Sequence, residues 1–496
     1  MIMRVFNVNK AIGYASSGVE YAQKYRRQIL KNIPWVEDFY IFTDYISTNL
    51  CVFSDLMDFP GERVIWIYNE LAGRKTKPCS VTVEAFVSGI PQVYVREDAN
   101  DKYTDLVLTE APVRYRIWKI KNRFVDRVDT IVSNKLERVD HYDECLNNVE
   151  YYQENELIRR VFYTREGKPA FQQFYQDREI TQTVIGGKVI NGRSEFFQYF
   201  FERLLSAPTD VMIVDRALDV IDGIYPIIGK HRLFAVVHAE HYDLKQAEDD
   251  VLLWNNHYEH VFANAHLFEG IVVSTNRQKE VLEGQLAKQP HAAEIVCIPV
   301  GVVHTIIQNT GYEKYSIMTA SRLAAEKHID MLINAVIEAK KALPGIRFDI
   351  YGEGKRDDLE KLIQEKNAGE YITLKGHYKL DGLYAKYGLY VTASTSEGFG
   401  LSLMEALAEG LPIVGFEVEY GNKEMVENGV NGLLFPYENS REDITNLAGG
   451  IVAVLSGGNL DRMKASSREK AQMYLAENVQ KRWEALLRGA ENAGNI

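Results

Sequence analysis

Two glutamates and two closely spaced glycines form the densest group of potentially reactive residues in the chain. They lie in the segment 395–405, Thr-Ser-Glu-Gly-Phe-Gly-Leu-Ser-Leu-Met-Glu, directly after an apolar run that predicts a strand over 389–393. The glycines allow a ligand to approach the backbone, and a helix expected over 401–409 offers free N–H groups to an anion. Glu397 and Glu405 are near enough to hydrogen-bond different hydroxyls of one ligand. The segment therefore predicts a ligand site at a strand end rather than a solvated surface.

Two basic residues follow a second expected strand, over 315–320. Arg322 and Lys327 lie in Ser-Arg-Leu-Ala-Ala-Glu-Lys, where both side chains can reach a phosphate. A guanidinium fork and an ammonium group can stabilise a departing diphosphate without a metal ion. An Asp-x-Asp motif, which would indicate a metal-bridged nucleotide, is missing from the sequence. The alternative without a function is that both are ordinary solvated cations at the protein surface.

A histidine ends a third apolar run, over 233–237. His238 opens the sequence His-Ala-Glu-His-Tyr, and at a strand end it can hydrogen-bond a sugar hydroxyl or a developing charge. A structural histidine is an equally good interpretation of the residue alone. His241 and Glu240 lie close by, so a metal site is a further option, but a third ligand at suitable spacing is missing. We therefore expect no metal.

The elements that must position these residues follow a β-α rhythm, which predicts parallel sheets. In the C-terminal part, we expect strands at 315–320, 346–351, 371–374 and 389–393 and helices at 327–343, 357–366, 380–387 and 401–409. A similar rhythm begins with a strand at 4–8 and a glycine turn at 13–18, which lacks the dinucleotide-binding fingerprint. It resumes with strands at 210–215, 233–238, 270–274 and 295–299.

Between these two parts, alternating Tyr, Phe, Val and Thr residues and turn signals predict an antiparallel insertion over 50–192. The predicted fold class is α/β, with two Rossmann-like domains and this β-rich insertion in the first. The first domain is expected to comprise 1–49 and 193–305, rejoined by a terminal helix over 480–496. The second is expected to span 306–479.

Composition limits the class of protein. The 496 residues are 46% hydrophobic and 25% charged, as in an ordinary globular protein of two or three domains. The net charge of −12 disfavours general nucleic-acid binding, and four scattered cysteines disfavour a disulfide framework or structural zinc site. Neither a signal peptide nor an apolar run of membrane-spanning length is evident. These features predict a cytoplasmic protein.

The combination of two Rossmann-like domains, Arg322 with Lys327, Glu397 and Glu405 spaced as Glu-x7-Glu, and the glycine-containing segment 421–434 resembles retaining GT-B glycosyltransferases of family 4. The segments 13–23, 236–242, 321–330 and 392–405 are also similar to the GtfA family, the catalytic subunits of the accessory Sec system.

The resemblance implies transfer of N-acetylglucosamine from UDP-GlcNAc to Ser/Thr hydroxyls of an unfolded, serine-rich adhesin. It implies a non-catalytic GtfB-like partner, contacted largely through the β-rich insertion. It implies no metal cofactor. Peripheral placement at the inner face of the cell membrane is an additional option.

The same resemblance implies a role for each site residue. Arg322 and Lys327 would hold the diphosphate, Glu405 the ribose hydroxyls, and His238 the sugar near the reacting centre. The remaining donor contacts would come from Glu397, Gly398, Phe399, Gly400 and Leu401 at the sugar and phosphates, Gly18 near the phosphates, and backbone around His377 at uracil. Retention is then expected by front-face attack, without a protein nucleophile.

Three alternatives remain open at this point. The donor can be UDP-glucose, because one acetamido contact would decide between the two sugars. The acceptor can be a lipid-linked or capsular glycan, although the long β-rich insertion argues against it. A binding subunit without turnover is disfavoured, because such a subunit is expected to lose Arg322, Lys327 or Glu397 and this chain has all three.

Overall fold

The computed structural model describes residues 2–13, 18–97, 101–243, 252–287, 289, 293–308 and 311–489. The chain divides into two compact units. Unit 1 comprises Met1–Lys24, Pro34–Val236 and Asn256–Gly270, and unit 2 comprises Tyr25–Ile33, Val237–Asn255 and Ile271–Ile496. Among the described helices, none combines the length and the apolar character needed to cross a membrane.

Unit 1 contains a parallel sheet formed by short apolar strands. In spatial order, the strands of this sheet that lie wholly within unit 1 are β15 (Arg232–Val236), β14 (Val211–Val214), β1 (Met3–Asn9), β2 (Val36–Phe42) and β3 (Val64–Trp66). Val5 of β1 is in register with Val211 of β14 and Asp38 of β2. Strands β1 and β14 are almost wholly buried, as expected for central parallel strands. The helix α1 (Gly18–Leu30) follows β1.

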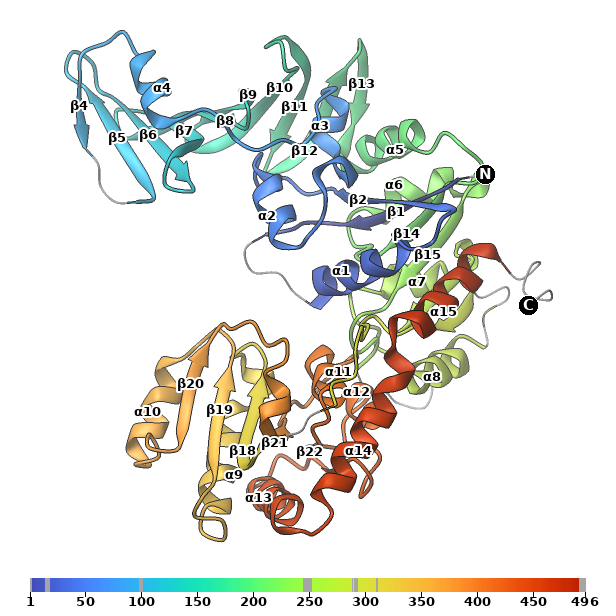
Figure 1. Ribbon diagram of the computed structural model, residues 1–496. Coiled ribbons are helices and arrows are strands. Elements are labelled where there is room, and N and C mark those ends of the chain that lie inside the picture. Colours follow the sequence, from blue (N-terminus) through green and yellow to red (C-terminus); the bar gives the residue numbers. More distant parts are fainter. Residues whose placement is uncertain are drawn as a thin grey trace. The chain divides into compact units, whose positions relative to one another are not determined.

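The described part of unit 1 also contains a ten-stranded antiparallel sheet, in the order β13 to β4 (Figure 1). Its strands are β4 (Tyr94–Glu97), β5 (Tyr103–Leu108), β6 (Val113–Ile120), β7 (Phe124–Val132), β8 (Lys135–Tyr142), β9 (Leu146–Gln153), β10 (Glu156–Tyr163), β11 (Pro169–Gln176), β12 (Glu179–Ile185) and β13 (Lys188–Asn191). Several hairpins turn on two residues with positive φ, such as Glu154-Asn155 and Gly186-Gly187. The antiparallel insertion predicted from the sequence is confirmed.

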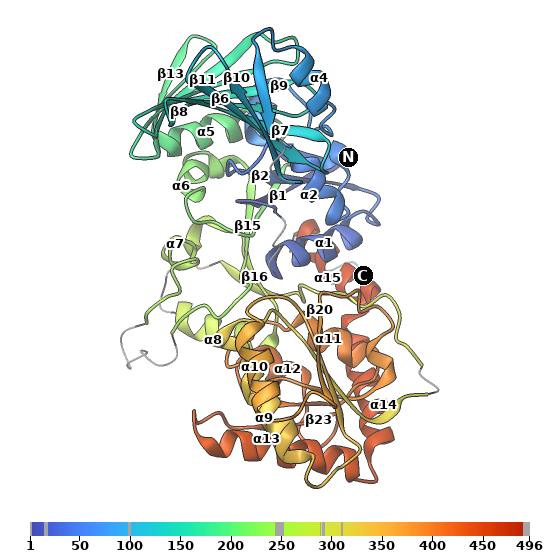
Figure 2. The ribbon, with the colours of Figure 1, turned by 90° about the vertical axis from the view of Figure 1, so that its left-hand side faces the viewer.

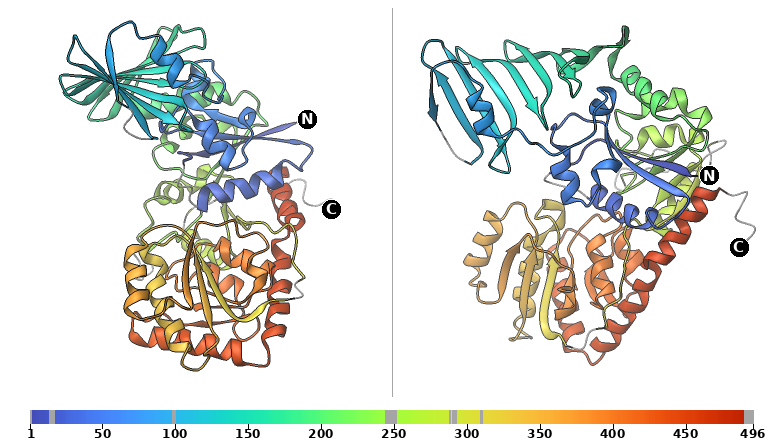
Figure 3. Two further views of the ribbon diagram at one scale, coloured as in Figure 1. Left: turned by 60° about the vertical axis from the view of Figure 1, so that its left-hand side comes forward. Right: turned by 45° about the horizontal axis from the view of Figure 1, so that its top comes forward.

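Helices lie beside two parts of this sheet. The helix α4 (Val83–Ser88) contacts β7, and α5 (Gly192–Leu204) contacts β12 and β13. Figure 3 shows the strands side by side in one long, twisted sheet. The other helical segments of unit 1 are α2 (Leu50–Leu56), η1 (Gly61–Arg63), α3 (Ile67–Leu71), α6 (Ile221–Ile224), η2 (Tyr225–Lys230), α7 (Glu259–Ala263) and η3 (Ala265–Leu267).

The antiparallel sheet begins later than the expected boundary at residue 50. Strand β3 pairs with β2 in parallel and so belongs to the parallel sheet. The helical segments between β3 and β4 also carry no antiparallel strand, and the sheet starts at Tyr94. A three-residue strand such as β3 is too short to show a sequence period, which explains the difference.

In the described part of unit 2, six parallel strands form one sheet. Their spatial order is β20 (Ile372–Gly376), β19 (Arg347–Tyr351), β18 (Glu313–Ala320), β21 (Tyr387–Val391), β22 (Ile413–Phe416) and β23 (Gly432–Phe435). This is the doubly wound order 3-2-1-4-5-6, in which the direction of winding changes between β18 and β21. The Rossmann-like topology predicted for the C-terminal part is confirmed.

Helices cover both faces of this sheet, each over its own apolar core (Figure 2). On one face are α9 (Ile329–Ala339), α10 (Asp357–Glu365) and α13 (Arg441–Ser456), and on the other are α11 (Leu401–Ala408) and α14 (Leu460–Ala471). The remaining elements of unit 2 are β16 (Gly270–Val273), which begins at the boundary, α8 (Asn276–Leu286), β17 (Glu294–Cys297), η4 (Ala325–Lys327), η5 (Tyr384–Lys386), α12 (Gly421–Met425), η6 (Gln472–Tyr474) and α15 (Ala476–Arg488).

The helix expected over 380–387 is shortened to the single turn η5. Gly382 has φ +72°, which interrupts a right-handed helix. The carboxylate of Glu409 accepts hydrogen bonds from the backbone N–H groups of Gly382 and Ala385, at 2.8 Å each. These bonds replace those that a continuous helix would form.

The C-terminal helix α15 packs on two segments that the sequence analysis placed in the first domain. The guanidinium of Arg26, in the part of α1 that belongs to unit 2, lies 5.1 Å from the ring centre of Trp483. Arg482 donates a hydrogen bond to the carbonyl of Cys297 at 3.2 Å. Residues 490–496 of the expected terminal helix lie outside the described residues.

Candidate functional site

The predicted donor residues lie where the winding of the unit 2 sheet changes direction. Arg322 and Lys327 follow β18, and the loop 395–400 follows its neighbour β21. The two strands are parallel, so their carboxyl ends open at the same edge of the sheet. Ligands of open α/β sheets bind at such a point. We call the segment 395–400 the donor loop.

An ion pair joins the two segments across this edge. The ammonium of Lys327 contacts the carboxylate of Glu397, and the two side chains are only 13% and 18% exposed. The backbone N–H of Thr395 also donates to the carbonyl of Glu326, at 3.3 Å. Lys327 is therefore a cation held in a partly desolvated position, where its charge acts strongly on a neighbouring anion.

Arg322 lies differently from Lys327. Its side chain is 71% exposed, and its guanidinium pairs with Glu326 at 3.1 Å. An exposed pair of this kind contributes little to stability, so the guanidinium can exchange Glu326 for a ligand phosphate at small cost. The role of Arg322 at the diphosphate stays a prediction.

The glycines of the donor loop lie where side chains would not fit. A Cβ atom at Gly398 would lie 2.4 Å from the carbonyl oxygen of His238, far inside van der Waals contact. Gly400 has φ +85° and precedes the first residue of α11, Leu401. The first N–H groups of α11 therefore begin directly at the donor loop, where they can bind an anion.

Replacing Gly398 by alanine is expected to displace the His238 backbone and lower kcat by about a hundredfold, since a shift near 1 Å at a reacting group has that effect. The control is Gly449→Ala in α13, where a Cβ meets no atom within 4 Å. That variant should keep full turnover and gain about 0.5–1 kcal/mol in unfolding free energy. Equal kcat values for the two variants would contradict the close fit at Gly398.

Glu405 lies in α11 and has both carboxylate oxygens occupied. Oε1 accepts from the hydroxyl of Tyr25 and Oε2 from the hydroxyl of Tyr384, each at 2.8 Å. Burial raises the pKa of Glu405, although both hydrogen bonds act in the opposite direction. The two tyrosines fix the carboxylate that the sequence analysis assigned to the ribose hydroxyls.

The segment that follows β15 carries His238 and the buried His241. His238 is half-buried and its carbonyl faces Gly398. His241 is completely buried, and its ring nitrogens contact side chains of α8 and Tyr420. In the described part of the chain, no group of three or more His, Cys, Asp or Glu side chains is arranged to hold a metal ion.

The other predicted residues occupy varied positions. Phe399 is buried against Tyr474, with ring centres 5.6 Å apart, so it packs in the core beneath the donor loop. His377 is exposed directly after β20. Gly18 begins α1 and belongs to unit 1, and residues 14–17 of its glycine turn lie outside the described residues. The roles of His377 and Gly18 stay predictions.

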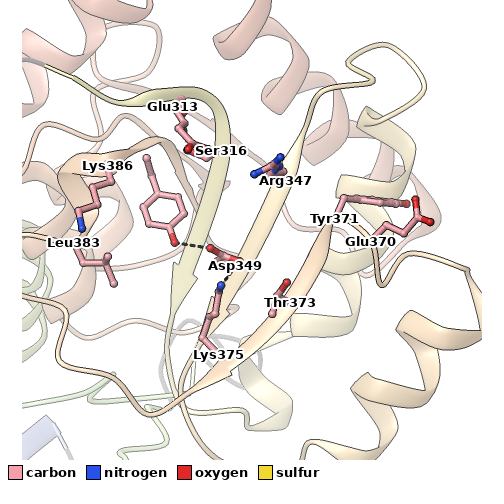
Figure 4. A pocket seen from close by; sticks show the side chains of 11 residues that line it. Glu313, Ser316, Arg347, Asp349, Glu370, Tyr371, Thr373, Lys375, Leu383 and Lys386 are labelled. Atoms are coloured by element: carbon pink, nitrogen blue, oxygen red, sulfur yellow. Dashed lines mark hydrogen bonds and ion pairs between the residues drawn. The ribbon is translucent and has the colours of Figure 1, made fainter.

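A pocket of ≈ 370 Å³ lies elsewhere in unit 2, on the polar face of β18, β19 and β20 (Figure 4). At its centre, Asp349 accepts a hydrogen bond from the hydroxyl of Tyr387 at 2.6 Å and pairs with Lys375 at 3.3 Å. None of its lining residues is a predicted site residue.

Three tyrosines that support the site were not predicted from the sequence. Tyr25 and Tyr384 donate hydrogen bonds to Glu405, and the hydroxyl of Tyr420 contacts His241. The segments around these tyrosines have an ordinary composition, which gives no sign of these contacts. Gly421 lies in the segment 421–434, whose turn glycines predict a mostly structural role and which is part of the family resemblance. A Cβ there would lie 2.0 Å from the carbonyl oxygen of Phe399.

Comparison with known proteins agrees with this geometry. The family described as "Glycosyl transferases group 1" matches residues 306–471, and the "GtfA extended beta-sheet domain" matches residues 96–184. The UDP-N-acetylglucosamine–peptide N-acetylglucosaminyltransferase GtfA subunit of Streptococcus gordonii is 36% identical, over 98% of both chains. The crystal structure of the pneumococcal O-GlcNAc transferase GtfA with UDP and GlcNAc has a TM-score of 0.91 and 35% identity, covering 98% of this chain and 99% of that one. The structure of a GtfA/B complex has a TM-score of 0.90 and 35% identity, with the same coverage.

A doubly wound sheet with Lys327, Glu397 and Glu405 at its switch point, together with the first of these family matches, defines a glycosyltransferase with the GT-B fold. The extended antiparallel sheet and the nearly full-length relatives narrow the class further. The chain belongs to the GtfA family.

Proposed function

We propose that this chain transfers N-acetylglucosamine from UDP-GlcNAc to serine and threonine hydroxyls of a serine-rich adhesin, before export by the accessory Sec system. The observation that carries the proposal is the ion pair between Lys327 and Glu397 at the switch point, with Glu405 held in the adjacent helix. Relatives at 33–36% identity are named UDP-N-acetylglucosamine–peptide N-acetylglucosaminyltransferase GtfA subunits, which supports this donor and acceptor class.

The chemistry assigns a task to each group. The bond between the anomeric carbon and the UDP oxygen breaks while the acceptor oxygen bonds to that carbon on the same face. Because the new bond forms on the face that UDP leaves, the sugar keeps its configuration, and the hydroxyl proton passes to a phosphate oxygen of the leaving UDP. Lys327 and Arg322 stabilise the charge that develops on the diphosphate. The N–H groups at the start of α11 add to this stabilisation, and Glu405 holds the ribose.

A GtfB-like subunit is the proposed partner, and the ten-stranded sheet of unit 1 is the proposed contact. The solved GtfA/B complex, which contains a chain 35% identical to this one, supports the assembly. The proposed setting is the cytoplasm, where unfolded adhesin and UDP-sugars are both present, with peripheral binding to the inner face of the membrane.

The test incubates the chain and its partner subunit with a serine-rich peptide and either UDP-GlcNAc or UDP-glucose, and measures UDP release and peptide mass. Addition of about 203 Da per site supports the proposal, whereas about 162 Da identifies the donor as UDP-glucose. UDP release that requires a lipid-linked or capsular glycan instead of the peptide would reject the proposed acceptor. Absence of turnover with every acceptor would indicate a binding subunit.

Turnover is expected to be unchanged by EDTA. The cationic side chains Lys327 and Arg322 and the N-terminus of α11 together supply the positive charge that a metal would otherwise bring to the diphosphate. The measurement is the rate of UDP release before and after chelation, with Mg²⁺ restored as the control. A loss that Mg²⁺ reverses would contradict this prediction.

A further inference from the structure

His241 is a buried histidine three residues beyond the predicted sugar contact, and the proposed chemistry gives it no task. Its side chain has no exposed surface. Nε2 lies 2.8 Å from Oε1 of Gln285. Nδ1 lies 3.2 Å from the hydroxyl of Tyr420 and 3.3 Å from Nε2 of Gln278.

These contacts determine which nitrogen carries the proton. The amide oxygen of Gln285 only accepts hydrogen bonds, so Nε2 of His241 must be the donor. Nδ1 is then the acceptor, toward the hydroxyl of Tyr420 and the amide of Gln278. Burial lowers the pKa of His241 to about 4, although the Gln285 hydrogen bond acts in the opposite direction. The ring is therefore neutral at physiological pH, with a partner for each nitrogen.

Tyr420 is attached to the donor loop. Its backbone N–H donates to the carbonyl of Glu397 at 2.7 Å, and the next N–H, of Gly421, donates to the same oxygen at 2.9 Å. The ring of Tyr420 lies nearly parallel to that of His241, with centres 5.6 Å apart. A displacement of the His241 ring would therefore also displace the backbone of Glu397, through Tyr420.

The segment that contains His241 is attached to the same loop at two further points. Gln278, whose amide contacts the His241 ring, also donates to the carbonyl of Ala239 at 2.9 Å. Glu240 shares a side-chain hydrogen bond with Ser396 of the donor loop. The carbonyl of His238 lies against Gly398. The two segments therefore form one packed assembly.

We propose that His241 is a positioning residue for the transfer reaction: through the hydroxyl of Tyr420, it fixes the segment of His238 to the donor loop that contains Glu397. The inference rests on the proposed function, because it assigns His241 to the same donor site. Its effect is exerted through His238 and Glu397, not through contact with the substrate.

The first test is Tyr420→Phe, which removes one hydroxyl and keeps the stacked ring. It should lower kcat about tenfold, the equivalent of 1.4 kcal/mol, with KM for UDP-GlcNAc and the dissociation constant of UDP nearly unchanged. The control is Tyr437→Phe, which removes a hydrogen bond to Asn439 outside the site and should leave kcat unchanged. Unfolding temperatures are measured for both variants.

A double variant separates positioning from general loss of structure. If His241 and Tyr420 position His238 and Glu397, adding Tyr420→Phe to His238→Ala should lower kcat by clearly less than the tenfold expected for Tyr420→Phe alone, because one of the two positioned groups is already absent. Full additivity of the two losses would overturn the inference. So would a Tyr420→Phe variant in which UDP binding and the unfolding temperature fall together with kcat.

The pH profile provides a readout that a merely structural role would not move. In Gln285→Glu, a carboxylate accepts from Nε2 and stabilises the imidazolium, so the pKa of His241 rises. Once His241 is protonated, its Nδ1 can no longer accept the hydrogen bond from the hydroxyl of Tyr420. Because this happens at a higher pH in the variant, the acid limb of its kcat profile should move to higher pH. The titratable and charged groups around His241 and Tyr420, which the variant leaves in place, are Glu240, Tyr242, Asp243, Arg277 and Glu419.

If the acid limb of the kcat profile is at the same pH in Gln285→Glu as in the unmodified chain, the inference is overturned. The unmodified chain with its partner is assayed in parallel, which separates this outcome from failure of the proposed function. If that complex binds UDP but transfers no N-acetylglucosamine to the peptide, the proposed function is rejected, and with it the role that rests on it. If it is active and Tyr420→Phe matches it, only the inference on His241 is rejected.

Discussion

Replacing Lys327 by methionine is expected to lower kcat by about two to three orders of magnitude. The ammonium contacts Glu397 and the side chain is only 13% exposed, so its charge is poorly screened at the place proposed for the diphosphate. Loss of a comparable preorganised donor to a developing anion costs roughly 2.7–4 kcal/mol of transition-state stabilisation. The measurement is steady-state UDP release with peptide acceptor, partner and saturating UDP-GlcNAc.

The matched control is Lys341→Met, which also breaks a lysine–glutamate pair in unit 2. Lys341 is 70% exposed and pairs with Glu338 on the surface, so kcat should stay unchanged. Lys327→Arg retains the charge and should recover part of the activity. A Lys327→Met variant with kcat within a few-fold of the unmodified chain would show that the diphosphate is stabilised elsewhere.

Replacing Arg160 by methionine is expected to destabilise unit 1 by about 3–5 kcal/mol, because it leaves a buried carboxylate without its cation. Arg160 donates to Glu150 at 3.0 Å and to the hydroxyl of Tyr175 at 2.8 Å, and its guanidinium lies over the ring of Tyr45. His141 contacts the second oxygen of Glu150 at 3.2 Å. Calorimetry should show the transition of unit 1 lowered by roughly 6–20 °C.

The neighbouring Arg159→Met is the control. Arg159 is exposed and lies over Tyr151, so its loss should cost no more than about 1 kcal/mol. The double variant Arg160→Met/Glu150→Gln should regain part of the stability, since it removes the unpaired charge. Equal unfolding temperatures for Arg160→Met and Arg159→Met would contradict the role of the buried pair.

The effect of Arg160→Met should also depend on pH. Burial opposes ionisation of Glu150, but Arg160 and His141 outweigh it and hold its pKa well below the usual range. The stabilisation from the pair is thus complete above the unfolded-state pKa of about 4.3, and it is lost as pH falls below that value. The difference between Arg160→Met and the unmodified chain should therefore shrink in acid.

The site was predictable to the extent that its residues are local in sequence. The donor loop follows the expected strand 389–393, Lys327 lies in the segment after the expected strand 315–320, and Glu405 lies in the expected helix 401–409, so local patterns and the family motif indicated them. The hydroxyls of Tyr25 and Tyr384 on Glu405, and that of Tyr420 on His241, depend on contacts across long stretches of chain. Composition and spacing carry no signal for such contacts.

By itself, the sequence determined the alternation of strands and helices in the C-terminal part, the antiparallel insertion and the resemblance to a glycosyltransferase family. These features depend on local periodicity, turn residues and short motifs, which are properties of neighbouring residues. Only the tertiary structure decided the strand order that brings β18 beside β21, the different environments of Lys327 and Arg322, and the neutral, hydrogen-bonded state of His241. The physical reason is that burial and electrostatic coupling depend on which distant segments pack together, and spacing along the chain does not encode that packing.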